Sequence, residues 1–210
     1  MKFYDCAIAP SPRRVRIFLA EKGLSLDTVQ IDLMTGENLK PEFLKVNPRG
    51  IVPVLQLDDG TCIDESFSIC RYIEELHPHP PLMGTDAKSR AVIDSRNRHM
   101  EADGFRAVAE AFRNSAPSFA KRGLAGVAAE VPAIPALAER GFAGIARFFD
   151  QIEGYLSQSE FIAGNQFSIA DITALCVVDF AGWVKQVLPA QHAHARRWHA
   201  AVSARPSAKA

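Results

Sequence analysis

The spacing of apolar residues changes at a proline-rich connection, and this change constrains the fold more than any other feature of the sequence. Before the connection (HPHPP, 77–81), apolar residues come in short runs separated by turn residues. After it, apolar residues recur at helical spacing and no convincing strand pattern is found. We therefore expect two domains of different class, at residues 1–80 and 86–210.

The first half alternates between strand and helix patterns. Strands are expected at residues 3–7, 26–33, 54–57 and 61–63, and a hairpin signal (DDG, 58–60) separates the last two. Helices are expected from residues 11 to 23, 41 to 46 and 65 to 76. The order βαβαββα predicts a small four-stranded mixed sheet with helices packed on it.

The second half reads as all-helical, which makes the whole chain α+β. Helices are expected at residues 86–115, 134–156, 168–183 and 191–203, with a loop over 117–135. Ser168 and Asp171 have the spacing of a capping box, and Phe167 with Ile172 has that of a hydrophobic staple. Loss of Asp171 should therefore cost about 1 to 2 kcal/mol.

Composition argues against several classes of partner. Lys plus Arg number 24 and Asp plus Glu number 24, so the chain has no net charge with which to hold nucleic acid or an anionic membrane. No run of 18 apolar residues occurs, and neither a membrane span nor a secretory signal is expected. The four cysteines lie far apart and the histidines are loosely spaced, which favours a reduced, cytoplasmic setting without a metal site.

Three motifs occur together and in order: SPRRVRIFLAEKG (11–23), NPRGIVPVL (47–55) with the downstream DES (64–66), and FIAGNQFSIADITA (161–174). As a set they closely resemble the cytosolic glutathione S-transferase superfamily. The resemblance implies a thioredoxin-like domain that binds glutathione, followed by a helical domain that contributes the second-substrate site. It also implies a homodimeric detoxification enzyme, in which the thiolate of bound glutathione attacks a small-molecule electrophile or a disulfide.

The resemblance assigns glutathione contacts to several positions. Val52, before Pro53 in a cis peptide, would offer its backbone to the cysteinyl part of the ligand. Ser66, at a helix start, would hold the γ-glutamyl carboxylate, and Glu65 would pair with the ligand's ammonium group. The alternatives are an ordinary strand-entry proline and a plain helix cap.

Two further contacts are implied less directly. Asn38 or Lys40, with Asn38 ranked first, would meet the glycyl carboxylate just before a short helix. The second substrate would lie against the first long helix of the C-terminal half, a segment that includes Phe105, Arg106 and Phe112.

The position that activates the thiol departs from the serine- and cysteine-type pattern. Counting back from the first helix reaches Ala9, which has no hydroxyl or thiol. Ser11 is the nearest hydroxyl, where bacterial nu-like members have an asparagine, and we take Ser11 as the candidate donor to the glutathione sulfur. A plain N-cap role for Ser11 and a catalytic role for Tyr4 are the alternatives.

The sequence therefore predicts a glutathione S-transferase that activates the thiol of bound glutathione. A glutathione-dependent disulfide reductase is the first alternative, because nu-like members favour that activity. A non-catalytic glutathione-binding module is the second, because Ala9 removes the usual donor.

Overall fold

The computed structural model describes all 210 residues, which form two compact units. The first comprises Met1–Pro80 together with Leu124–Val131 and Ala210, and the second comprises Pro81–Gly123 and Pro132–Lys209. The segment Leu124–Val131 thus belongs to the first unit, although its neighbours on both sides along the chain belong to the second.

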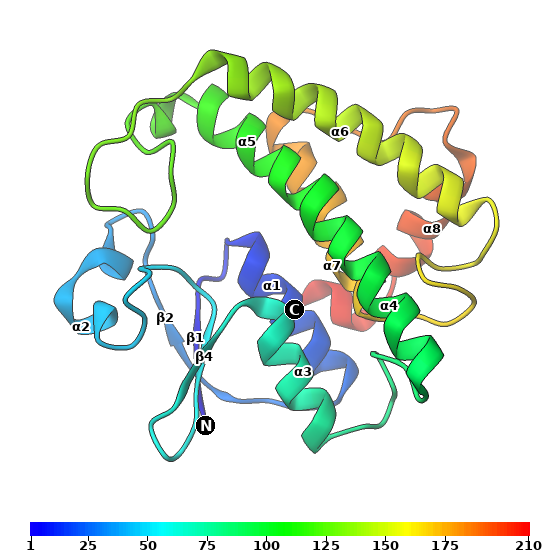
Figure 1. The fold of residues 1–210 in the computed structure, drawn as a ribbon, viewed down its shortest axis with the longest axis horizontal. Helices are drawn as coiled ribbons and strands as arrows, with labels where there is room; N and C mark the ends of the chain where they lie inside the picture. The colour runs from blue at the N-terminus through cyan, green and yellow to red at the C-terminus, as the bar shows by residue number, and fades with distance from the viewer. The chain divides into compact units, whose positions relative to one another are not determined.

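The first unit is built on a four-stranded mixed sheet, as expected (Figure 1). Its strands are β1 (Lys2–Asp5), β2 (Asp27–Gln30), β3 (Val54–Gln56) and β4 (Cys62–Asp64), in the order β2-β1-β3-β4. β1 pairs parallel with β2 and antiparallel with β3, and β3 pairs antiparallel with β4. The helices are α1 (Pro10–Glu21), α2 (Pro41–Leu44) and α3 (Ser66–Leu76), with a 3-10 turn, η1 (Glu37–Leu39), before α2.

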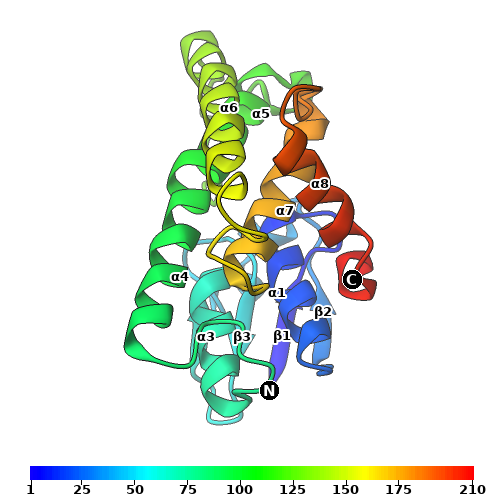
Figure 2. The same ribbon diagram turned by 90° about the vertical axis from the view of Figure 1, so that its right-hand side faces the viewer.

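Side chains alternate across this sheet, so its two faces have different neighbours. Phe3 of β1 lies opposite Leu55 of β3, and both are buried. α1 and α3 pack side by side and bury apolar stripes (Figure 2). Tyr4 and Val54 alternate to the other face, where Val54 joins Phe43 of α2 in a second core cluster.

The second unit is helical throughout. Its longer helices are α4 (Ala87–His99), α5 (Arg106–Ser115), α6 (Pro135–Leu156), α7 (Ile169–Ala181) and α8 (Ala193–Ser203). The shorter turns are η2 (Met100–Phe105), η3 (Pro117–Phe119), η4 (Gly182–Val184) and η5 (Pro206–Lys209). The helix expected at 86–115 is therefore one helical run interrupted by η2, a π-helical segment.

α5 and α6 pack closely because α6 has glycines at the contact. A Cβ atom added at Gly141 would lie 2.5 Å from the amide nitrogen of Ala111, and one at Gly144 would lie 2.7 Å from the Cβ of Ala107. The backbones approach at distances that larger residues would prevent.

The start of α7 forms the predicted capping box around a buried carboxylate. Asp171 accepts hydrogen bonds from the amides of Ser168 (3.0 Å) and Ile162 (2.9 Å), from the Ser168 hydroxyl (3.1 Å) and from the indole of Trp198 (2.9 Å). Burial, opposed by these hydrogen bonds, raises the pKa of Asp171 to about 6. The carboxylate thus connects α7, α8 and the preceding loop, which is more than a local helix cap.

None of the helices is both long and apolar enough to cross a membrane.

Candidate functional site

The start of α1 differs from the expectation at Ser11. The helix begins at Pro10, and its N-cap is Ala9, which makes no side-chain capping bond. The N-cap interpretation of Ser11 is therefore wrong, because Ser11 is the second helical residue. Pro10 and Pro12 have no N–H group, so Ser11 carries the single amide donor among the first three helical positions. Its hydroxyl and amide both lie at the positive end of the helix.

The loop that leads into α1 is held by an ion pair that the sequence reasoning missed. Arg16 of α1 contacts the buried carboxylate of Asp5 at 2.6 Å and donates to the carbonyl of Ala7 at 2.8 Å. Gln30 of β2 donates to the second oxygen of Asp5 at 2.8 Å. These bonds set the path of the chain between β1 and Ser11.

The start of α3 adjoins the start of α1. Ser66 is 3% exposed, and its hydroxyl donates to the carbonyl oxygen of Ser11 at 2.8 Å. α3 has no side-chain cap, and its N-cap residue, Glu65, has a φ of 64°. Two positive helix ends therefore meet at one place, which suits an anionic ligand.

Arg49 bridges two carboxylates beside this helix start. Its Nη1 atom lies 2.5 Å from Oε1 of Glu65 and 3.1 Å from Oδ2 of Asp64. Hydrogen bonds to Glu65 and then to Asp64 raise the pKa of Arg49. Arg49 was missed, although it lies within the motif NPRGIVPVL, because nothing local indicates a partner 16 residues away.

Val52 and Pro53 lie directly before β3, and the peptide bond between them is cis, as expected. Val52 is partly buried and packs on the core cluster of Ile31, Phe43 and Val54. The contact of its backbone with glutathione stays a prediction.

Asn38 and Lys40, the two candidates for the glycyl carboxylate, have different environments, and their contact with glutathione stays a prediction. Asn38 is 6% exposed, and its amide group donates to the carbonyl of Gly50 at 2.7 Å. One of the two hydrogens of this amide group is thus directed to the interior, and the side chain is nearly buried. Lys40 is exposed at the N-cap of α2 and is the better candidate.

The three second-substrate candidates do not lie together. Phe105 and Phe112 both contact Phe180, the first with a tilted ring and the second edge-on, at centroid distances of 5.8 and 5.4 Å. Phe119 and the half-exposed Trp183 extend this aromatic cluster. Arg106 instead lines a groove of about 470 Å³ between α5 and α6. The sequence spacing placed all three residues on one helix but did not resolve its faces.

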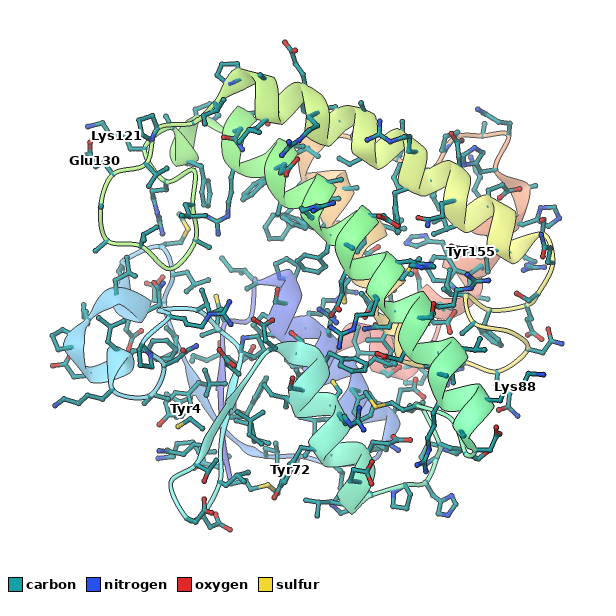
Figure 3. All side chains as sticks on the ribbon, viewed as in Figure 1. Tyr4, Tyr72, Lys88, Lys121, Glu130 and Tyr155 are labelled. Carbon is teal, nitrogen blue, oxygen red and sulfur yellow. The ribbon has the colours of Figure 1, made fainter.

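Tyr4 has a packing environment. Its hydroxyl donates to the side-chain oxygen of Gln56 at 3.1 Å, and its ring meets Phe43 edge-on at 6.0 Å (Tyr4 is labelled in Figure 3). This arrangement favours the structural interpretation over a catalytic one.

The histidines of the C-terminal segment each contact one carboxylate. His192 pairs with Asp150 and His194 with Glu153, both of α6, while His199 pairs with Asp179 of α7. These are separate pairs, and no group of three or more His, Cys, Asp or Glu side chains converges as metal ligands would.

Together, the architecture defines a thioredoxin-like unit, with two helix starts meeting next to a cis proline, and a helical unit. Family comparison agrees with this class. Residues 9–76 match the glutathione S-transferase N-terminal domain, and residues 124–206 match the glutathione S-transferase C-terminal domain.

Two relatives match along the whole chain, and a third matches part of it. Glutathione S-transferase 2 of Saccharomyces cerevisiae is 37% identical, over 100% of this chain and 88% of its own length. The crystal structure of a glutathione S-transferase domain-containing protein from Marinobacter aquaeolei is 35% identical, covers 99% of both chains and superposes with a TM-score of 0.91. Maleylacetoacetate isomerase of Pseudomonas aeruginosa is 41% identical, but only over 43% of this chain and 44% of its own.

The chain therefore belongs to the glutathione S-transferase family, and its enzymatic class is that of a glutathione transferase. The predicted fold and the predicted family are both confirmed.

Proposed function

We propose that the first unit binds glutathione between the starts of α1 and α3 and activates its thiol for attack on an electrophilic small molecule. The observation that carries the proposal is the hydrogen bond from Ser66 to the Ser11 carbonyl, which joins the two helix starts. Ser66 would hold the γ-glutamyl carboxylate and Glu65 the ammonium group. The backbone of Val52, before Pro53, would pair with the cysteinyl residue, and Lys40 would meet the glycyl carboxylate.

Activation of the thiol is assigned to Ser11. A cysteine thiol has a pKa of about 8.5, so most of it is protonated at neutral pH. The hydroxyl and amide of Ser11, at the positive end of α1, would stabilise the thiolate once its proton has passed to water. The sulfur lone pair then forms the new S–C bond, while a leaving group departs with its bonding electrons.

The aromatic cluster in the second unit supports an apolar, aromatic electrophile. Phe105, Phe112, Phe119, Phe180 and Trp183 form a continuous set of rings, and Trp183 is 50% exposed. Such surfaces bind planar apolar molecules through burial and stacking. Arg106 is not part of this surface, so we do not include it in the proposed second-substrate site.

Calorimetry with glutathione and a conjugation assay with an aryl halide test this function. Binding in the micromolar to millimolar range and conjugation above the uncatalysed rate are expected. A disulfide assay run in parallel tests the reductase alternative, in which two glutathione molecules reduce one disulfide to two thiols and become oxidised glutathione. Binding without either activity would establish the non-catalytic module.

We also propose that the enzyme is a cytoplasmic homodimer without nucleic acid or membrane partners. The family supports self-association, and the balance of 24 basic and 24 acidic residues supports the absence of polyanionic partners. Light scattering at several protein concentrations should give twice the monomer mass, and a monomer mass at every concentration would contradict the dimer.

A further inference from the structure

The segment Leu124–Val131, called the strap below, packs against the turn that precedes the cis proline. A Cβ atom added at Gly126 would lie only 2.2 Å from the carbonyl oxygen of Arg49 and 3.0 Å from the side chain of Ile51. Gly126 has a φ of 73°, which glycine adopts without strain. The strap therefore meets the turn backbone to backbone (Lys121, before the strap, and Glu130, within it, are labelled in Figure 3).

The turn itself, residues 47–51, is organised by Asn47, which is 4% exposed. The Asn47 side chain accepts from the amide of Arg49 at 3.1 Å and donates to the carbonyl of Ile51 at 2.9 Å. Gly50 faces the strap from the turn, because a Cβ atom there would lie 3.2 Å from the carbonyl oxygen of Gly126. The two glycines therefore pass each other closely, with no room for a Cβ atom at Gly126.

The turn also carries the contacts that organise the proposed glutathione site. The Arg49 side chain holds Glu65 at 2.5 Å, next to Ser66 at the start of α3. Ile51 directly precedes Val52, whose backbone is proposed to pair with the ligand. A shift of the turn would therefore move both the carboxylate and the strand edge of the site.

We infer that Gly126 is a positioning residue for glutathione, because the strap supports the turn from which Arg49 holds Glu65. This inference rests on the proposed function and adds to it a segment that lies far from the site in sequence. It predicts that displacing the strap weakens glutathione binding and leaves the chemical step intact.

The test replaces Gly126 with asparagine. Asparagine tolerates positive φ better than other side chains, so Gly126→Asn chiefly introduces the collision with Arg49. Gly23→Asn is the matched control, since Gly23 has a φ of 68° and no atom within 4 Å of an added Cβ. Gly126→Asn should raise the glutathione Kd and KM about tenfold, with kcat at saturating glutathione within about twofold. Gly23→Asn should change neither.

A double-mutant cycle separates this role from a general loss of structure. If the strap acts through Arg49, then Gly126→Asn should cost little further affinity in an Arg49→Ala background. Additive losses, or an unchanged Kd in folded Gly126→Asn, would overturn the inference. If Gly126→Asn fails to fold, Gly50→Asn tests the same contact from the turn, because a Cβ atom added at Gly50 would lie 3.2 Å from the carbonyl oxygen of Gly126.

Failure of the proposed function gives a different result. If the unmodified protein shows no heat of binding with millimolar glutathione, the proposed function falls and the strap inference falls with it. If the unmodified protein binds glutathione, and Gly126→Asn and Gly23→Asn bind it with the same Kd as the unmodified protein, only the role of Gly126 is rejected.

Discussion

Replacement of Asp171 by alanine should destabilise the second unit well beyond the loss of a helix cap. The change removes the acceptor of three buried N–H groups, on Ile162, Ser168 and Trp198. A buried donor left without a partner costs about 1 to 3 kcal/mol. Even the low end of that range gives about 3 kcal/mol at pH 7 for three donors, against about 1 to 2 kcal/mol expected for a capping box alone.

The size of this loss should depend on pH, with a sign that follows from the raised pKa of Asp171. The pKa of this carboxyl is 3.8 in the reference state and about 6 in the fold, where burial disfavours its charged form. Its stabilising contribution is therefore complete below pH 4 and is lost as the pH rises through 6, by about 3 kcal/mol in total. The alanine variant lacks this term, so its deficit should be largest at pH 4 and below, and smallest near pH 7.

Urea unfolding followed by far-ultraviolet circular dichroism, at one protein concentration, measures both effects. Glu139→Ala is the matched control, because Glu139 is exposed on α6 and its loss should change the free energy of unfolding by less than about 0.5 kcal/mol. A deficit below about 1 kcal/mol for Asp171→Ala at pH 7, or a deficit that grows with pH, would refute the reasoning.

Four other substitutions give three separate tests. Ser66→Ala should weaken glutathione binding by about 1 to 2 kcal/mol in calorimetry, because the carboxylate loses a charge-assisted partner, and an unchanged Kd would remove Ser66 from the site. Ser11→Ala should raise the pKa of the bound thiol in a titration of thiolate absorbance, whereas an unchanged titration would remove Ser11 from the mechanism. Gly141→Ala and Gly154→Ala, both on α6, should have opposite effects on thermal unfolding. The first meets Ala111 at 2.5 Å and should destabilise by about 1 to 3 kcal/mol, while the second has open space and should stabilise by about 0.5 to 1 kcal/mol.

Local patterns predicted the elements, and tertiary contacts decided where they end. The strand expected at 26–33 is shorter, because only Asp27–Gln30 pair with β1. The long helix expected at 86–115 contains a π-helical segment at Met100–Phe105, where Gly104 lies against the ring of Phe148. A contact between residues 44 positions apart leaves no trace in helical periodicity.

Local structure at the candidate site was predicted where a motif sets it, and contacts were missed where a distant partner makes them. The helix start at Glu65 and Ser66 and the cis peptide before Pro53 were predicted correctly, while their contacts with glutathione stay predictions. The bonds of Arg49 to Glu65 and of Arg16 to Asp5 join segments 16 and 11 residues apart, and residue spacing does not encode such pairs.

The sequence also could not predict the hydrogen-bond partner of the Asn38 amide group, or the sides of the helix on which Phe105 and Arg106 lie. Both depend on how a loop or helix turns against its neighbours. Asn38 is directed inward to Gly50, and Arg106 lies towards α6 instead of towards Phe180. Residue type alone suggested accessible ligand contacts at each of these positions.

The side chain of Ser66 has a single hydrogen to donate, and it donates this hydrogen to the carbonyl oxygen of Ser11. To donate to a γ-glutamyl carboxylate, as proposed, the hydroxyl would have to rotate and release that carbonyl, so binding of the glutamyl group would alter the contacts of Ser11, the proposed donor to the sulfur. Cysteinylglycine, which lacks the glutamyl group, would leave the serine contact in place. The thiol of the dipeptide should then meet a differently arranged Ser11 than the thiol of the tripeptide does.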